Sequence, residues 1–149
     1  MADPARPETT QADVDRARAA LWREDWASQA LGMVLREVSP GRARVEMTVR
    51  RDMLNGFGLC HGGILTTLGD TAMAFASNSH NERAVATNLA MEFLAPGREG
   101  DVLVAEAREM SRTRRTGLYD ATITNPSGQV IALLRGRVQR VPGSPVAED

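Results

Sequence analysis

The stretch that decides the fold runs from Leu54 to His80 and reads LNGFGLCHGGILTTLGDTAMAFASNSH. Asp70 is its single charged residue, in a chain in which 25% of residues are charged. From Gly62 onward the apolar residues recur with the three- and four-residue spacing of a helix. A helix on a protein surface normally carries several long charged side chains. Because this helix carries one carboxylate, its outward face is expected to be covered.

At 100° per residue, the helix expected over residues 62–79 has two different faces. One face is an apolar stripe that would pack on a sheet, formed by Ile64, Leu65, Leu68, Ala72, Phe75 and Ala76. The opposite face is small or weakly polar and consists of Gly63, Thr66, Asp70, Met73, Ala74 and Ser77. No further element of the chain is evidently free to cover this second face. The sequence therefore predicts that a second copy of the chain covers it.

The segments on both sides of the long helix alternate as strands do. Residues 32–52 indicate a hairpin, since Pro40-Gly41 is a turn signal and apolar residues alternate with polar ones after it. Four more strand-like segments follow the helix, at residues 84–96, 100–110, 116–124 and 129–141. Two groups of strands around one helix predict an α+β domain, with an antiparallel sheet wrapped around that helix.

The rest of the chain fits a single domain with two tails. Residues 13–31 carry a partly apolar stripe and predict one helix or two short ones. The domain is then expected over residues 13–141. Residues 1–12 and 142–149 are expected to be flexible tails.

Composition excludes several classes of protein. The chain has 149 residues, a formal net charge of -1 and one cysteine, Cys60. One cysteine cannot form an internal disulfide, so a disulfide-built secreted scaffold is excluded. The N-terminus has no apolar signal segment, and no apolar run approaches the roughly 20 residues that span a bilayer. No block of basic charge stands out. We therefore expect a cytoplasmic protein that binds neither nucleic acid nor a membrane.

The pair Gly62-Gly63 at the start of the long helix is a candidate oxyanion site. Each glycine within a helix lowers the stability of the helix by about 1 kcal/mol relative to alanine. Two consecutive glycines therefore suggest a structural or functional requirement at this position. The first N–H groups of a helix have no partner inside it and can donate to a developing oxyanion. The alternative is a loop that only reverses the chain. Asn55 is ambiguous in the same way, because its amide can donate to a carbonyl or a water, but Asn-Gly is also a common turn pair.

Asp70 has a structural and a chemical interpretation. In a partly buried interface a carboxylate is costly unless it is paired or used, and desolvation raises its pKa. Gly62 and Asp70 lie eight residues apart, which is about 12 Å along one helix. A base and an oxyanion donor must each lie within about 3 Å of one reacting group. An antiparallel second copy would bring Asp70 of one chain near Gly62 of the other.

Asn55, the run His61-Gly62-Gly63 and Asp70, at this spacing, resemble the motif of the hotdog-fold acyl-CoA thioesterases, and most of all their phenylacetate-degradation (PaaI) branch. The resemblance extends over about residues 30–140. It implies a hotdog fold, in which a curled antiparallel sheet wraps one helix, and a homodimer that often pairs into a dimer of dimers. It also implies hydrolysis of an acyl-CoA, typically phenylacetyl-CoA or hydroxyphenylacetyl-CoA. Coenzyme A is part of the substrate, and no cofactor or metal is expected.

The same resemblance implies a role for several residues by their position. Asp70 is the nucleophile or the general base, the Gly62 N–H polarises the thioester carbonyl, and Asn55 assists. Asn88 falls where relatives commonly carry a Ser or Thr that assists the water, and it departs from that pattern. The residues before about position 25 lie outside the resemblance and receive no function.

Other polar residues near these positions have two interpretations each. His61 is expected to orient the loop rather than to activate Cys60, because adjacent side chains rarely point at one another. Arg112, Arg114 and Arg115 lie near a predicted hairpin turn, where they either bind the phosphates of CoA or form a solvated turn. The cysteine and the two histidines match no zinc-binding spacing.

Two further functions stay open on the sequence alone. One is a non-catalytic hotdog protein that binds acyl-CoA and acts as a regulator. The other is a hotdog dehydratase or hydratase, which uses a His together with an acid. The long helix supplies Asp70 but no His at a comparable depth, which favours a thioesterase.

Overall fold

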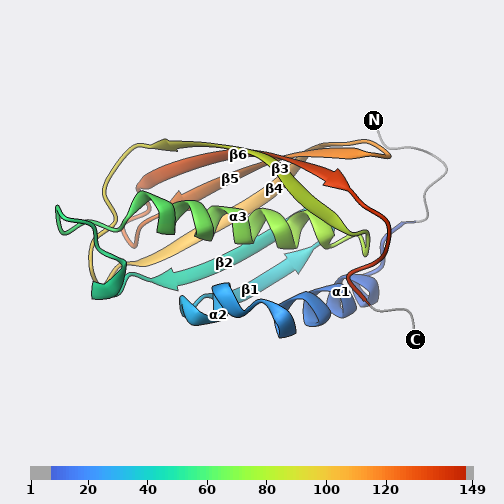
Figure 1. Cartoon of the computed structure of the whole chain (residues 1–149), viewed down its shortest axis with the longest axis horizontal. Helices are drawn as coiled ribbons and strands as arrows, with labels where there is room; N and C mark the ends of the chain where they lie inside the picture. The colour runs from blue at the N-terminus through green and yellow to red at the C-terminus, as the bar shows by residue number, and fades with distance from the viewer. Residues whose placement is uncertain (1–7, 147–149) are drawn as a thin grey trace.

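The computed structural model describes residues 8–146 (Figure 1). The helices are α1 (Gln11–Glu24), α2 (Trp26–Ala30), the 3-10 turn η1 (Arg51–Met53) and α3 (Gly62–Asn78). The strands are β1 (Val34–Ser39), β2 (Arg42–Thr48), β3 (Ala84–Phe93), β4 (Val102–Arg112), β5 (Thr116–Thr124) and β6 (Val130–Arg140). The predicted order of two strands, one long helix and four strands is confirmed, and residues 13–31 contain two helices rather than one.

The six strands form one antiparallel sheet in the order β1-β2-β4-β5-β6-β3. Figure 1 shows this sheet curling around α3, which is the hotdog architecture that the resemblance implied. The first hairpin turns at Pro40-Gly41 as predicted, and Gly41 has a φ of 72°, a conformation that glycine adopts without strain. Glu109 approaches this glycine so closely that a Cβ at position 41 would lie 3.0 Å from the Cβ of Glu109.

The apolar stripe of α3 packs on the concave face of the sheet. Most of its predicted members are buried, and Ile64 is half-buried against the same core. Met73 is the main correction, because the sequence placed it on the outward face and the structure buries it completely. Its sulfur lies against Gly136 of β6, where any side chain would collide with it. Ser77 is also buried, and its hydroxyl donates to the Ala74 carbonyl at 3.1 Å.

The two N-terminal helices cover one flank of α3, contrary to the expectation that no other element of the chain was free to do so. The rings of Trp22 in α1 and Phe75 in α3 lie 6.0 Å apart between centroids. Ser28 in α2 hydrogen-bonds Thr71 in α3 at 2.9 Å, with both residues buried. A narrower face of α3 stays at least partly open in the single chain, formed by Gly63, Thr66, Thr67, Asp70 and Ala74.

The start of α1 differs from the prediction by two residues. Gln11 and Ala12 were assigned to the N-terminal tail but are helical, because Thr10 and Asp13 form a capping box in front of them. Residues 1–7 of the expected N-terminal tail and 147–149 of the expected C-terminal tail lie outside the described residues. None of the helices in the described part of the chain has the length and apolar character that a bilayer crossing requires.

Candidate active site

The N-terminus of α3 leaves one backbone donor free. His61 caps the helix, and its Nδ1 accepts a hydrogen bond from the Gly63 N–H at 2.9 Å. The His61 carbonyl accepts from the N–H groups of Ile64 and Leu65. Within residues 8–146, no atom accepts a hydrogen bond from the Gly62 N–H. Of the two glycines, Gly62 is therefore the one that can donate to a ligand, and His61 orients the loop as expected.

The ring of Phe93, at the end of β3, packs on Gly62. A Cβ at position 62 would lie 3.1 Å from Cζ of Phe93, which is closer than ordinary van der Waals contact. Because Gly62 has no side chain, it leaves room for the Phe93 ring and also keeps its own backbone N–H accessible. Phe93 is 54% exposed, Leu94 beside it is 57% exposed, and Phe57 in the preceding loop is 90% exposed. An apolar surface of this kind next to a free N–H suits an apolar ligand or a partner chain.

Asn55 has a structural role that leaves its amide group free. Its Oδ1 accepts hydrogen bonds from the N–H groups of Phe57 at 2.9 Å and Leu59 at 3.2 Å. Backbone N–H groups can only donate, so this oxygen assignment is forced by the contacts. The Nδ2 amide group donates no hydrogen bond to any of the described residues. Asn55 is therefore a turn residue and an available donor at once, whereas the sequence presented these as alternatives.

Two substitutions at Asn55 should separate its two roles. Asn55→Asp keeps an oxygen for the loop and removes the amide donor, so we expect an unchanged melting temperature and a kcat lowered about 10- to 100-fold. Asn55→Ala removes both and should also lose about 1 kcal/mol of stability. Thermal melts and steady-state kinetics of both variants measure this. Wild-type kcat in Asn55→Asp would mean that the amide takes no part in the reaction.

Asp70 lies midway along α3 on its open face, where it is half-buried. Its carboxylate makes no hydrogen bond and no ion pair with any of residues 8–146. Desolvation raises its pKa above the ordinary value, and the negative charge of Asp25 raises it further. An unpaired carboxylate with a raised pKa is a good general base or nucleophile, which fits the role that the family resemblance implies for Asp70.

The raised pKa predicts how stability depends on pH. Well below the ordinary carboxyl pKa, Asp70 is protonated in the folded and the unfolded chain, so Asp70→Asn should melt like the wild type. As pH rises through the folded-state pKa, the wild type must ionise a desolvated group and loses stability that the variant keeps. The melting temperature of Asp70→Asn minus that of the wild type should therefore grow from acid to neutral pH. A difference that shrinks over that range would contradict the raised pKa.

Asn88 lies at a bulge in the edge strand β3. The register between β3 and β6 shifts between Ala86 and Asn88, and Thr87 Oγ1 donates to the Arg137 carbonyl at 3.3 Å. Bulges often redirect a side chain beside an active site. The Asn88 side chain is exposed and has no hydrogen-bond partner in the described part of the chain. It is therefore available to a ligand or to a second copy.

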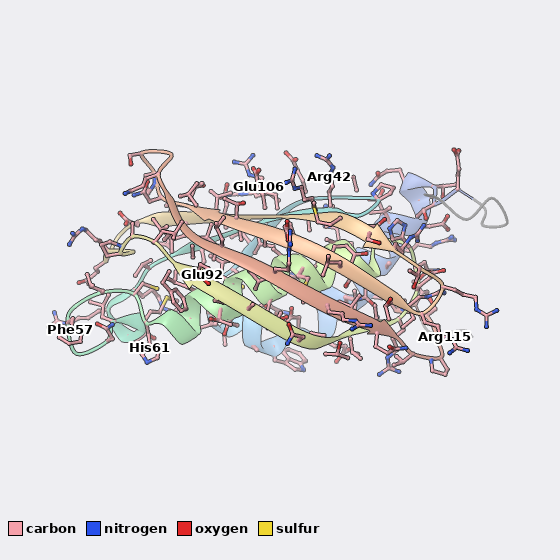
Figure 2. All side chains as sticks on the ribbon, turned by 90° about the horizontal axis from the view of Figure 1, so that it is seen from above. Arg42, Phe57, His61, Glu92, Glu106 and Arg115 are labelled. Atoms are coloured by element: carbon pink, nitrogen blue, oxygen red, sulfur yellow. The ribbon has the colours of Figure 1, made fainter. Side chains whose placement is uncertain are left out.

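The three arginines of the predicted phosphate cluster surround the β4–β5 turn as expected. Arg112 is held by ion pairs with Glu82 and Glu109, both at 3.7 Å, whereas Arg114 and Arg115 are exposed. In Figure 2, Arg115 lies at the opposite end of the molecule from His61. One chain therefore does not bring these arginines to the start of α3.

Within a single chain the candidate residues stay in separate places. Asn55, His61, Gly62 and Gly63 share the start of α3, because residues 54 and 60 pair across the loop that precedes it. Asp70 lies about 12 Å further along the same helix. The structure thus confirms the separation that suggested a site built from two chains.

Cys60 is poorly suited to act as a nucleophile at this site. Cys60 is buried, and burial raises the pKa of its thiol to about 11, so it stays protonated near neutral pH. Residues 8–146 hold no group of three His, Cys, Asp or Glu side chains placed to bind a metal ion.

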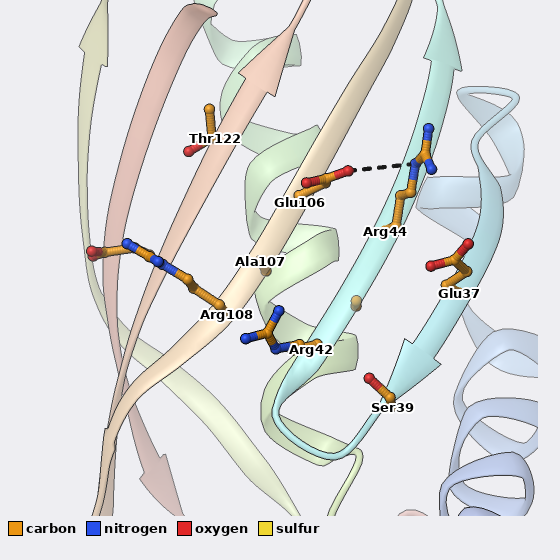
Figure 3. Close-up of a pocket in the computed structure, with 10 residues that line it drawn as sticks. Glu37, Ser39, Arg42, Arg44, Glu106, Ala107, Arg108 and Thr122 are labelled. Atoms are coloured by element: carbon orange, nitrogen blue, oxygen red, sulfur yellow. Dashed lines mark ion pairs between the residues drawn. The ribbon is translucent and has the colours of Figure 1, made fainter.

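A separate hollow of about 490 Å³ lies on the outer face of the sheet (Figure 3). Its main side chains, such as Arg42 and Arg44, alternate along β2 with the buried Ala43 and Val45, so they point away from α3. Arg44 and Glu106 form an ion pair at 3.7 Å across this hollow, which Figure 3 marks. This hollow is not part of the site around α3.

The sequence interpretation missed two residues at the site. Phe93 was read only as part of a strand, and its contact with Gly62 depends on the crossover that places β3 beside the start of α3. Asp25 had a local signal, because Asp is a preferred N-cap residue at the start of a helix. Nothing local indicated that this cap lies near Asp70.

Comparisons with known proteins agree with these observations. The model of the thioesterase superfamily matches residues 57–132, which include the loop after Asn55 and the whole of α3. The acyl-coenzyme A thioesterase PaaI of Escherichia coli strain K12 is 41% identical over 129 residues, which are 87% of this chain and 92% of that protein. A putative esterase of Archaeoglobus fulgidus is 37% identical over 86% of this chain and 83% of its own length.

Solved structures give the same result. The structure of the E. coli PaaI protein from the phenylacetic acid degradation operon has a TM-score of 0.88 and 39% identity, over 89% of this chain and 96% of that chain. A Streptococcus mutans protein solved with bound acetyl CoA has a TM-score of 0.72 and 28% identity, over 75% of this chain and 90% of that one.

Proposed function

The chain belongs to the thioesterase superfamily, and from that premise we propose that it hydrolyses the thioester of an acyl-CoA to the free acid and coenzyme A. The observation that carries this proposal is Asp70, an unpaired carboxylate on the open face of the helix whose Gly62 N–H is free. A thioester carbonyl needs such a pair, one group to attack or to activate water and one to bind the oxyanion.

The chemistry follows from these two groups. Asp70 either attacks the carbonyl carbon itself or takes a proton from a water that attacks it. The carbonyl oxygen becomes negative and accepts a hydrogen bond from the Gly62 N–H, with the Asn55 amide as a second donor. The carbon–sulfur bond then breaks, and CoA leaves as a thiolate that is protonated by water or by the proton that Asp70 took. If water attacked, the free acid forms directly. If Asp70 attacked, water then hydrolyses the mixed anhydride on Asp70, which releases the free acid and restores the carboxylate. These steps need no metal or cofactor, so dialysis against a chelator should leave the activity unchanged.

The acyl group is proposed to be phenylacetyl or hydroxyphenylacetyl. The similarity to PaaI supports this class, and so does the exposed Phe93 ring on Gly62, because an aromatic acyl group can pack against it. The test is a panel of phenylacetyl-, hydroxyphenylacetyl-, acetyl- and long-chain acyl-CoA, with release of free thiol as the signal. We expect the highest kcat/KM for the aromatic pair. Tight binding without thiol release would instead favour the non-catalytic acyl-CoA-binding protein.

A homodimer with shared sites is proposed as the working form. Strand β1, at one edge of the sheet, is covered by α1, from which Arg18 donates to the Leu35 carbonyl at 2.8 Å. Strand β3, at the other edge, has ten residues, and its outer edge is unpaired within residues 8–146. A long exposed edge pairs readily with another chain. Two antiparallel β3 strands would place the open faces of two α3 helices side by side.

The same arrangement would bring other residues to the site. Because the second α3 runs antiparallel, the partner's turn with Arg114 and Arg115 would approach the Gly62 end of the first chain, where the CoA phosphates need cations. Asn88 on β3 would lie at the joint between the two sheets. Two such dimers are proposed to form a tetramer, and light scattering measures the molar mass directly.

A further inference from the structure

We propose that Asp25 is a positioning residue for Asp70, holding a fixed second negative charge beside it so that Asp70 is a stronger base or nucleophile. The proposal deepens the proposed function and rests on it. It assigns a role to the N-terminal helices, which lie outside the central helix and its motif.

Hydrogen bonds fix Asp25 near the middle of α3. Asp25 stands between α1 and α2 and ends one helix while it caps the other. Its Oδ1 accepts a hydrogen bond from the Ser28 N–H at 3.1 Å. The hydroxyl of the same Ser28 meets Thr71 Oγ1 at 2.9 Å, and Ser28 is 2% exposed. Thr71 follows Asp70 directly, so this chain of contacts places Asp25 beside the turn of α3 that carries Asp70.

The electrostatics agree with this geometry. After desolvation, repulsion by Asp25 is the second cause that raises the pKa of Asp70. No other charged group on α1, α2 or the strands that pack on α3 contributes within the described residues. Three arginines of α1 and of the segment after β2 have other partners. Arg18 donates to the Leu35 carbonyl, Arg23 pairs with Glu24, and Arg50 pairs with Asp52. Among residues 8–146, no basic side chain therefore forms an ion pair with Asp25 or Asp70 that would offset their repulsion.

The effect of this repulsion is on reactivity. A carboxylate with a raised pKa is a better proton acceptor and a better nucleophile, provided that it is still ionised at the working pH. Desolvation produces part of the rise in the pKa of Asp70, and the negative charge of Asp25 adds to it without touching the substrate. Because surface charges are screened by ions, the contribution of Asp25 should weaken as the salt concentration rises.

Three substitutions separate the charge of Asp25 from its helix cap. Asp25→Asn and Asp25→Ser remove the charge and keep a good N-cap residue. Asp25→Glu keeps the charge but is a poorer cap. The direct readout is a carbon-13 NMR titration of the Asp70 carboxyl group in the full-length protein labelled at aspartate, with its signal assigned by its absence in Asp70→Asn. The second readout is the acid limb of the pH profile of kcat, and thermal melts report the cap.

We expect Asp25→Asn and Asp25→Ser to shift the Asp70 titration and the acid limb to lower pH, with melting temperatures near that of the wild type. Asp25→Glu should melt lower and titrate like the wild type. Added salt should shift the wild-type titration to lower pH and change that of Asp25→Asn less. An Asp70 titration that is the same in Asp25→Asn and wild type would overturn the proposal. The NMR signal does not depend on catalysis, so this outcome is distinct from an Asp70→Asn enzyme that still turns over, which would refute the proposed function instead.

Discussion

Asp70→Asn is expected to lower kcat by a factor on the order of 10² or more while the fold is kept. The reason is that the open face of α3 carries one carboxylate, and an amide can neither attack a thioester nor take a proton from water. The substitution is nearly isosteric, and Asp70 makes no hydrogen bond or ion pair within residues 8–146 that the change would break. A thermal melt at neutral pH gives the control, because the variant should be at least as stable as the wild type there.

Steady-state kinetics with the best substrate of the acyl-CoA panel measure the effect. KM should change little, since Asp70 acts on the reacting carbonyl rather than on the CoA portion. A matched control is Thr67→Ala, on the same open face of α3, whose hydroxyl only donates to the Gly63 carbonyl at 2.9 Å. If Asp70→Asn retained near-normal kcat in a folded protein, another residue would have to supply the base.

The second large effect is the recovery of activity when two inactive variants are mixed. Asp70→Asn removes the base, and Gly62→Pro removes the N–H that would bind the oxyanion. Each homodimer should be nearly inactive. A heterodimer combines the intact Gly62 of one chain with the intact Asp70 of the other, and it should regain one of two sites. Activity near half of the wild-type value per heterodimer is therefore expected.

The structure indicates that Gly62→Pro can fold. Position 62 is the first residue of α3, where proline is tolerated because its missing N–H has no partner in the helix. His61 before it has a φ of -59° and a ψ of 133°, within the extended region that a residue before proline prefers. The Phe93 ring must move by a few tenths of an ångström to admit the new Cβ, and this ring is half-exposed.

Subunit exchange has to be verified before the mixture is assayed. Chains with two different affinity tags, purified in succession, yield assemblies that contain both variants, and native mass spectrometry of the assemblies and of their dimers identifies the heterodimer. A mixture of wild type and Asp70→Asn controls for activity gained by exchange itself. A pure heterodimer with only background activity would show that Gly62 and Asp70 act within one chain.

The sequence determined the local elements of this protein by itself. The spacing of apolar residues predicts the helix over Gly62–Asn78 and the strand β2, and turn chemistry predicts the turn at Pro40-Gly41. These signals are local, because they depend on residues that are neighbours in the sequence. The sparse charge on α3 is itself enough to indicate that this helix lies enclosed. The types of group at the candidate site, a lone carboxylate and a glycine pair at a helix start, are equally visible in the sequence.

Only the tertiary structure decided which of these groups are available and what surrounds them. The cap made by His61 occupies the Gly63 N–H and leaves that of Gly62 free. The curl of the sheet buries Met73, which a helical wheel alone places outward. The packing of α2 on α3 puts Asp25 near Asp70, although the two residues are far apart in the chain. The His61 cap is a local contact that the spacing of apolar residues does not reveal. The burial of Met73 and the position of Asp25 join residues that are distant in sequence, because they depend on how the sheet curves and on what packs against its helix.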